Sequence, residues 1–310
     1  MTDSVQQYAA HLRSRAQRLG LQDADCSLPV SKFFQTGGFK IHFLDWGGDG
    51  PPIILLHGGG LNAHTWDMIC IGLRGKYRCI AMDLRGHGES DWSPEGDYAV
   101  ASHTVDGFAL LDMLGLKRAA VVGMSLGGLI AIDMAVTRPE LVVALCLVDS
   151  VPRMPPAAGS QAMLEFRSKK VFPDLDAAVR HALAFNPRRT AESLRVSLSR
   201  SLRQLPDGSL TWKHDVERMD APRQLRLDAL MTQLWSAAAA IQCPILLARG
   251  AESAAVPREA AAAFIAHVAH ASLVEIPNAG HTVQGDNPRE LLRALAGFLY
   301  TAYPTETARL

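Results

Sequence analysis

Short apolar runs alternate with longer amphipathic segments along most of this 310-residue chain. The runs expected to form strands are rich in Val, Ile and Leu and cover residues 52–58, 77–84, 118–123, 142–150, 243–250 and 272–277. The segments expected to form helices repeat apolar residues at helical spacing and cover 63–74, 98–114, 126–137, 257–269 and 288–302. This alternation indicates parallel strands in a sheet that is covered by helices on both faces. The sequence therefore predicts an α/β fold with a doubly wound, mostly parallel sheet.

Residues 1–30 precede this pattern and are expected to form a helical arm. A helix over 4–19 would carry apolar residues, beginning with Tyr8, along one side. This side covers either the body of the protein or a neighbouring subunit, so the sequence leaves a homodimer open. Two apolar runs then flank Gly37 and Gly38, a pattern typical of a β-hairpin.

The alternation stops between residues 151 and 240, where the chain is more polar and its pattern is helical throughout. We interpret 151–240 as a helical cap, inserted into a core domain that consists of 31–150 and 241–310. The pattern predicts no strand in this insertion. Residues 194–206 are expected to form one helix, whose basic face points into solvent and carries Arg195, Arg200 and Arg203.

Composition excludes several classes of partner. Lys and Arg together number 31, as do Asp and Glu, so no polybasic face is expected to bind nucleic acid or an anionic membrane. The N-terminal stretch lacks the apolar core of a signal peptide, and no window reaches the roughly 18 apolar residues of a spanning helix. The five cysteines are widely spread without C-x-x-C spacing, so we expect no metal and no other cofactor. A cytoplasmic protein that acts on a small molecule is the expectation.

One predicted strand leads directly into a helix through the residues "GMSLG" at 123–127. A serine at the carboxyl end of a parallel strand lies at the sheet edge where such folds bind ligands. Glycines on both sides allow the tight turn, because Cβ atoms at those positions would have no room. The helix that follows directs free N–H groups and the positive end of its dipole toward the serine. The pattern G-x-S-x-G is typical of a nucleophile elbow, so Ser125 is the candidate nucleophile.

Three further motifs accompany the elbow: "LLHGGG" (55–60), "DLRGHGES" (83–90) and "AGHTVQGDNP" (279–288). Together with "GMSLG", and in the same order and spacing, they resemble the α/β-hydrolase fold superfamily over nearly the whole chain, from about Lys32 to Tyr300. The resemblance implies that the first motif is an oxyanion-hole loop and the last is the loop of the catalytic histidine. A serine at the elbow disfavours the dehalogenase and epoxide-hydrolase branches, which resemble this fold but place aspartate there.

His281 is the candidate general base, because it follows the last predicted strand on a short loop at the same sheet edge as Ser125. His57 and His87 lie in glycine-rich turns, where an imidazole is more often used to brace a loop through hydrogen bonds. An oxyanion needs two backbone donors. These are expected to be the N–H of Leu126 and that of Gly59, with Gly60 as the alternative.

The carboxylate that should hold the histidine is harder to place. In the superfamily this acid commonly follows the strand after the cap, two to four residues past a glycine. Here that segment reads "ARGAESAAVP" and has no aspartate, because Ser253 or Ala254 stands at that place. Asp149, 24 residues after Ser125, is preferred as the acid, and Glu252 is the alternative; a chain without a conventional acid also remains open. Either residue keeps the order serine, acid, histidine.

These residues predict a serine hydrolase that cleaves a carboxylic ester or lactone through an acyl-enzyme. The alternatives are hydrolysis of a C–C bond in a vinylogous diketone, and a weakly catalytic homologue that binds a small ligand. The substrate is expected to be small, largely apolar and acyl-bearing. Residues expected to line its pocket are Met124, Phe166, Phe172, Trp212 and Trp235.

Overall fold

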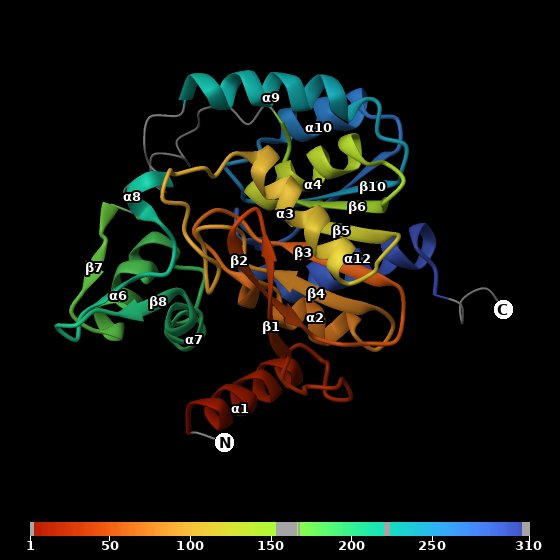
Figure 1. Ribbon diagram of the computed structural model, residues 1–310. Coiled ribbons are helices and arrows are strands. Elements are labelled where there is room, and N and C mark those ends of the chain that lie inside the picture. Colours follow the sequence, from red (N-terminus) through yellow and green to blue (C-terminus); the bar gives the residue numbers. More distant parts are fainter. Residues whose placement is uncertain (1–2, 153–165, 167, 220–223, 306–310) are drawn as a thin grey trace.

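An eight-stranded sheet forms the centre of the molecule (Figure 1). The computed structural model describes residues 3–152, 166, 168–219 and 224–305. Across the sheet the strands are β1 (Val30–Thr36), β2 (Phe39–Asp45), β4 (Arg78–Met82), β3 (Pro52–Leu56), β5 (Ala119–Met124), β6 (Val142–Val148), β10 (Ile245–Gly250) and β11 (Ala271–Ile276). The pairs β1–β2 and β2–β4 are antiparallel and the other pairs are parallel, which confirms the predicted sheet.

Helices cover both faces of this sheet, as the strand pattern predicted. One face packs against α3 (Val100–Met113), α4 (Leu126–Thr137), α9 (Gln224–Ala238) and α10 (Arg258–His267). The other packs against α1 (Asp3–Arg18), α2 (Asp67–Leu73), which follows the short 3-10 helix η1 (Ala63–Trp66), and α12 (Pro288–Ala302). Alternate residues of β5 pack into the two apolar layers that lie between the sheet and these helices. Val121 faces the first layer, with α3, α4, α9 and α10, whereas Ala120 and Val122 face the second.

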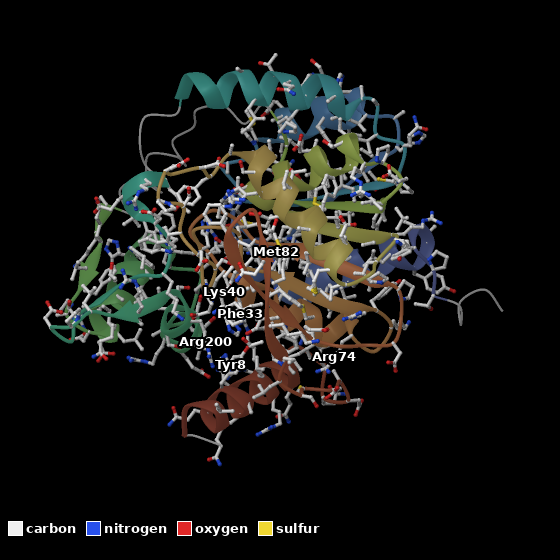
Figure 2. All side chains as sticks on the ribbon, in the orientation of Figure 1. Tyr8, Phe33, Lys40, Arg74, Met82 and Arg200 are labelled. Atoms are coloured by element: carbon white, nitrogen blue, oxygen red, sulfur yellow. The ribbon has the colours of Figure 1, made fainter. Side chains whose placement is uncertain are left out.

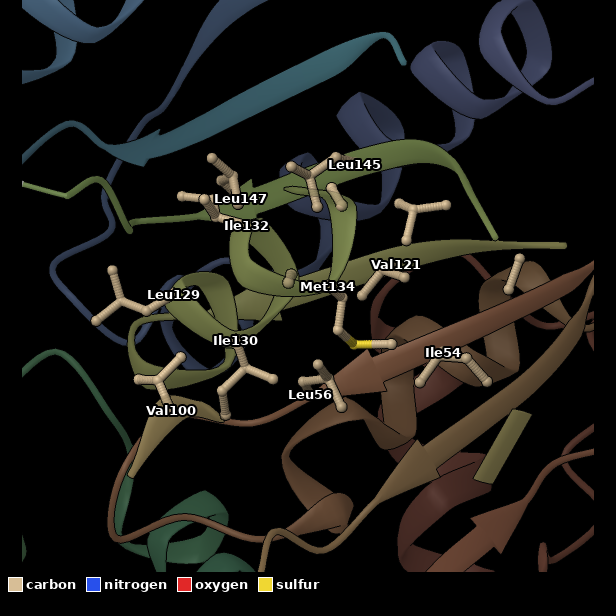
Figure 3. Packing of buried hydrophobic residues seen from close by; sticks show 14 of the residues in the cluster. Ile54, Leu56, Val100, Val121, Leu129, Ile130, Ile132, Met134, Leu145 and Leu147 are labelled. Carbon is tan, nitrogen blue, oxygen red and sulfur yellow. The ribbon is translucent and has the colours of Figure 1, made fainter. Parts of the chain in front are cut away.

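The first layer is a dense apolar core in which the elbow helix α4 is fixed (Figure 3). Ile130 and Met134 of α4 pack against Leu56 and Val121 of the sheet, and all four side chains are fully buried. Full burial of one such side chain contributes about 1.5–3 kcal/mol relative to exposure. The helix that begins at the candidate nucleophile is therefore held by its own core-facing side chains.

The N-terminal arm lies against the body of its own chain. Tyr8, Leu12 and Ala16, one helical turn apart, are buried in the layer that also contains α2 and α12. The predicted helix over 4–19 is thereby confirmed to within a residue at each end. The β1–β2 hairpin turns at Gly37 and Gly38, both with positive φ, as the sequence predicted.

The insertion between β6 and β10 contains strands as well as helices, and here the sequence-based expectation was wrong. Its described helices include α6 (Leu175–Phe185), α7 (Ala191–Ser201), α8 (Val216–Met219) and α9. A small antiparallel sheet of β7 (Val171–Phe172), β9 (Leu210–Trp212) and β8 (Leu202–Gln204) lies beside them. Strands of two or three residues are too short to show the alternation that identifies a strand. The helix expected over 194–206 accordingly ends at Ser201, and β8 follows directly.

No helix within the described part of the chain has both the length and the apolar character needed to cross a bilayer.

Candidate active site

Ser125 occupies a strained turn between strand β5 and helix α4. Its backbone has φ 51° and ψ −114°, a conformation that residues with a side chain rarely adopt. A Cβ on Gly123 would lie 2.2 Å from the carbonyl oxygen of Gly127, and one on Gly127 would lie 2.2 Å from that of Leu56. Both glycines are therefore required by the close approach of backbone, as the sequence analysis predicted.

A chain of hydrogen bonds joins the three residues expected to carry the chemistry. His281 Nε2 lies 3.1 Å from Ser125 Oγ, and His281 Nδ1 lies 2.7 Å from Asp149 Oδ2. Because a carboxylate only accepts, Nδ1 carries the hydrogen, and Nε2 is left as the acceptor for the serine hydroxyl. Serine, histidine and aspartate thus stand in the arrangement that activates a nucleophile.

Asp149 is completely buried at the end of β6, and its carboxylate is held from three sides. Besides the imidazole of His281, the backbone N–H of Gly250 donates to Oδ1 at 3.0 Å. The hydroxyl of Ser253 donates to Oδ2 at 2.5 Å, and it also accepts a hydrogen bond from the N–H of Ala255. Strand β10 lies beside β6, so the segment after the cap still contributes to holding the acid.

Glu252, the alternative acid, is engaged elsewhere. Its carboxylate forms an ion pair with the guanidinium of Arg188, with Nη2 at 2.7 Å from Oε2, and its side chain is 46% exposed. Its backbone N–H donates to the carbonyl oxygen of Ala279 in the histidine loop. The structure therefore brings Asp149 to His281 and places Glu252 at the protein surface.

One of the two loop glycines considered as oxyanion donors has its amide engaged by the neighbouring loop. The N–H of Gly60 donates to His87 Nε2 at 3.0 Å, so this amide is already bound. Leu126 is the first residue of α4, and the first N–H groups of a helix have no acceptor within the helix itself. Roles for Gly59 and Leu126 in binding an oxyanion stay a prediction.

His57 and His87 brace the loops beside the nucleophile, as the sequence analysis expected. His57 Nδ1 donates to the carbonyl of Gly58, while its Nε2 accepts from the N–H of Leu84. His87 Nδ1 donates to the carbonyl of Arg85. Burial lowers the pKa of both imidazoles, and that of His87 lies well below its usual range. Both rings are therefore neutral, and their hydrogen bonds connect the loop after β3 with the loop after β4.

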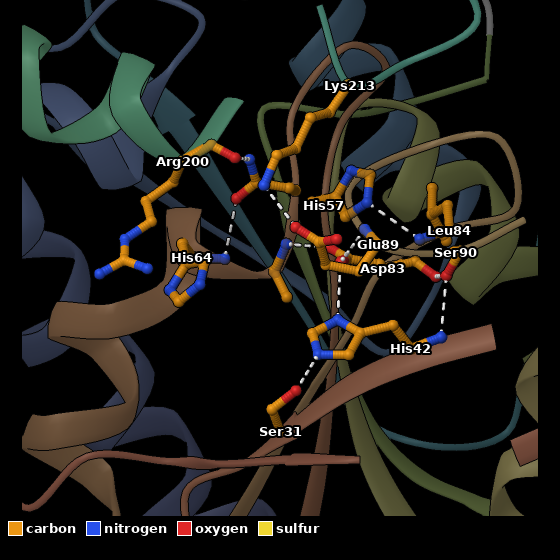
Figure 4. Close-up of polar contacts among 12 residues, drawn as sticks. Ser31, His42, His57, His64, Asp83, Leu84, Glu89, Ser90, Arg200 and Lys213 are labelled. Carbon is orange, nitrogen blue, oxygen red and sulfur yellow. Dashed lines mark hydrogen bonds and ion pairs between the residues drawn. The ribbon is translucent and has the colours of Figure 1, made fainter. Parts of the chain in front are cut away.

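A second polar network fixes the start of η1 (Figure 4). Asp83 is almost fully buried and accepts from His42 Nδ1 at 2.7 Å and from the backbone N–H groups of Ala63 and Glu89. Burial raises the pKa of the Asp83 carboxyl, but the hydrogen bond and charge of His42 outweigh this effect, so its pKa is lowered. The network ties the β4 loop to the chain that follows the oxyanion loop.

The residues expected to line the substrate pocket have packing partners. Phe172 and Trp212 are buried against each other in the cap, with ring centroids 5.4 Å apart, and Phe166 contacts Trp212. Trp235 of α9 stacks on His267 of α10. The side chain of Met124 is buried below the elbow, where a Cβ on Gly58 would strike its sulfur. Substrate binding by this set stays a prediction.

Within the described residues no group of three or more His, Cys, Asp or Glu side chains is arranged to hold a metal ion.

The sequence did not predict the hydrogen bond from the Ser253 hydroxyl to the Asp149 carboxylate. The sequence did draw attention to this position, because Ser253 or Ala254 stands where related sequences carry the acid. The sequence showed only that a carboxylate is missing at this position. The fold shows in addition that the hydroxyl of Ser253 reaches the carboxylate of Asp149, which follows the neighbouring strand β6.

The fold and site geometry agree with comparisons to known proteins. A sequence profile described as "Alpha/beta hydrolase family" matches residues 53–294. The chain is 34% identical over 301 residues to the "Esterase Rv0045c" of Mycobacterium tuberculosis, an alignment that covers 94% of this chain and 95% of that protein. The crystal structure of that esterase matches with a TM-score of 0.76, covering 94% of this chain and 96% of the other. The chain belongs to the alpha/beta hydrolase family.

Two other relatives show the same relationship at greater distance. The 3-hydroxybutyrate-oligomer hydrolase of Cupriavidus necator is 29% identical over 291 residues, covering 90% of this chain and 96% of that protein. The 2-(acetamidomethylene)succinate hydrolase of Mesorhizobium japonicum is 27% identical over 255 residues, covering 81% and 89%. A crystal structure of an E-2-(acetamidomethylene)succinate hydrolase matches at a TM-score of 0.77 and 25% identity, covering 87% of this chain and 99% of the other. Hydrolysis is the activity shared by these relatives.

Proposed function

We propose that this protein is a serine hydrolase that cleaves a carboxylic ester or lactone through an acyl-enzyme. The observation that carries the proposal is the hydrogen-bonded series from Ser125 through His281 to Asp149. The similarity to a protein named an esterase, at 34% identity over nearly the whole chain, supports an ester as the bond that is cleaved.

In the first half of the reaction, Ser125 Oγ attacks the carbonyl carbon of the substrate. His281 Nε2 takes the hydroxyl proton as the C–O bond forms, and Asp149 stabilises the resulting imidazolium and keeps the ring in place. The oxyanion that develops is bound by the N–H groups of Leu126 and Gly59, next to the positive end of helix α4. His281 then returns the proton to the leaving alcohol, which leaves the acyl group on Ser125.

In the second half, a water molecule replaces the alcohol. His281 removes a proton from this water as its oxygen attacks the acyl carbon, and the same two amides bind the second oxyanion. Collapse of this intermediate returns the proton to Ser125 Oγ and releases the carboxylic acid. The protein ends the cycle in its starting protonation state, so no cofactor is consumed.

Hydrolysis of a short p-nitrophenyl ester by the purified protein tests the proposal. We expect turnover by the wild type, and loss of kcat by a factor of about 10⁶ in Ser125→Ala and in His281→Ala, as in other serine hydrolases. Ser199→Ala, a change at an exposed cap serine whose hydroxyl contacts its own helix, is the matched control and should keep full activity. Turnover that survives Ser125→Ala would contradict the proposed nucleophile. Cleavage of a vinylogous diketone in place of the ester would favour C–C hydrolysis instead.

A further inference from the structure

A small cavity of about 40 Å³ lies where the N-terminal arm meets the cap and the histidine loop. Its walls include Arg15 of α1, Arg189 just before α7, Arg200 of α7, and Gln284 of the short helix α11 (Val283–Asp286). The contact between arm and cap is visible where Arg200 lies over the ring of Tyr8, 3.9 Å from its centroid (Figure 2). We call this space the arginine cavity. Neither Ser125 nor His281 lines it.

Three guanidinium groups line the arginine cavity, and none of them forms an ion pair with a carboxylate of the described residues. This differs from Arg195, which is also on α7 but points outward and pairs with Asp176. From the sequence we expected Arg200 to lie in solvent like Arg195. The fold instead brings α1 against this side of α7, and Arg200 becomes half-buried.

The acidic groups near the arginine cavity are bound to other partners. Asp67 lines the cavity, but its carboxylate accepts from the hydroxyl of Tyr8 at 2.5 Å and contacts His64 Nδ1 at 3.2 Å. Asp286, the carboxylate that acts on Arg189, accepts from the side chain of Asn186 and from a backbone N–H. Glu192, on the first turn of α7, pairs with Arg18 at the surface. The lining therefore carries an excess of positive charge.

Polar atoms at this cavity also lack hydrogen-bond partners. Gln284 is 1% exposed, and its Oε1 has no partner among the described residues, although its Nε2 donates to Thr65. Arg189 Nε and His11 Nε2 are buried and equally without a partner there. A buried polar atom without a hydrogen bond destabilises the folded protein, so a native fold rarely gathers three of them. Their grouping around one cavity indicates a site made for a polar occupant.

Burial also disfavours the charged form of two arginines that line the cavity. It lowers the pKa of Arg189 to about 10 and also lowers that of Arg15. Both guanidinium groups remain charged near neutral pH, and their charge is partly desolvated without a direct ion pair to the nearby carboxylates of Asp67 and Asp286. An anion between them would remove this cost.

We propose that the arginine cavity binds a small oxyanion, a carboxylate or phosphate group. Guanidinium forks match both groups, because they donate two parallel hydrogen bonds to neighbouring oxygens. The cavity volume equals that of roughly three water molecules on the same scale, which suits one such group. Gln284 Oε1 is an acceptor, so it favours an occupant that also carries a hydroxyl, such as hydrogen phosphate or a hydroxycarboxylate. This binding site is separate from the proposed ester hydrolysis.

Isothermal titration calorimetry with the full-length protein tests the site. Sodium phosphate and sodium glycolate are titrated separately, at an ionic strength kept constant with sodium chloride, so the two arms distinguish a phosphate from a hydroxycarboxylate. We expect saturable binding of at least one anion at one site per chain. Arg15→Gln and Arg189→Gln should each weaken that binding at least tenfold, in line with a lost charge-assisted hydrogen bond. Arg195→Gln, on the outer side of the same helix, should bind as the wild type does.

Two results would overturn the proposal: no saturable heat with either anion, or binding that is unchanged in both Arg15→Gln and Arg189→Gln. Circular dichroism melting shows whether each variant is folded, and Arg200→Gln replaces any variant that is not. The calorimetric signal does not depend on ester turnover. A protein that binds the anion but cleaves no ester would therefore contradict only the proposed function.

Discussion

Asp149 and Glu252 make different predictions at the residue scale, because only the first contacts His281 in the structure. We expect Asp149→Asn to lower kcat by up to ~10⁴-fold, since the amide leaves the imidazole in the wrong tautomer. Glu252→Gln should stay within about tenfold of the wild type, because it removes an ion pair that is largely exposed. Steady-state kinetics on the same ester compares them. The reverse order of the two variants would show that the acid was wrongly assigned.

Ser253 is a positioning residue, because we expect it to affect the reaction only through its hydrogen bond to Asp149. Ser253→Ala removes one of three hydrogen bonds to the carboxylate and should lower kcat about tenfold with little change in KM. Ser253→Thr keeps the hydroxyl and should restore most of the rate. A purely structural role for Ser253 would instead lower thermal stability and leave kcat per folded molecule unchanged. Stability and kcat measured on the same preparations separate these outcomes.

At the scale of elements, the elbow tolerates no added side-chain atom. Gly127→Ala would place a Cβ 2.2 Å from a main-chain oxygen of β3, so backbone must move. We expect a loss of at least about 1–3 kcal/mol in the free energy of unfolding, together with loss of activity as Ser125 shifts. Gly297→Ala is the control, because this glycine is exposed on α12 with open space around it. It should stabilise the protein by up to ~1 kcal/mol through helix propensity. Equal effects in urea denaturation would contradict this explanation of the elbow.

The sheet and its helices could be predicted from the sequence because their signals are long. Helix α4 was expected at 126–137 and lies at Leu126–Thr137, and the other core elements differ from expectation by a few residues at their ends. The three short cap strands could not be predicted, since β7 has two residues and β8 has three. The pairing of β7 with β9 also depends on contacts between segments about 40 residues apart in the chain, such as Val171 with Thr211.

In the site, too, local sequence signals predicted some residues, whereas others depend on contacts between distant segments. Ser125 and His281 sit in motifs within single loops, so local sequence was enough to select them. The choice of Asp149 over Glu252 depended on which strand ends meet across the sheet, and the register of β6 with β10 decides this. Arg200 is the clearest failure, because nothing local shows that the distant arm will pack over its helix face.

At the scale of the whole molecule, stability should depend on pH through the buried histidines. Burial lowers the pKa of His57 and His87 from the usual value of 6.5, so each stays neutral in the folded protein. Below that value the unfolded chain binds protons that the folded protein does not, and the free energy of unfolding therefore falls as pH falls. Each histidine contributes a slope of up to about 1.4 kcal/mol per pH unit.

Urea denaturation at pH 7.5 and 5.5 measures this dependence. The wild type should be less stable at the lower pH, and His87→Gln should show a smaller difference between the two. An unchanged slope in His87→Gln would mean that other groups cause the pH dependence. Greater stability of the wild type at pH 5.5 would contradict the assigned direction.

The proposed hydrolysis requires that Ser125 be a nucleophile activated by His281 and Asp149. Labelling with a fluorophosphonate, which reacts covalently with activated serines, tests this most directly. We expect one label per chain, located on Ser125 by peptide mass spectrometry, and greatly slowed labelling in His281→Ala and Asp149→Asn. Folded wild-type protein that takes up no label, or a label found on a serine other than Ser125, would show that Ser125 is not the activated nucleophile.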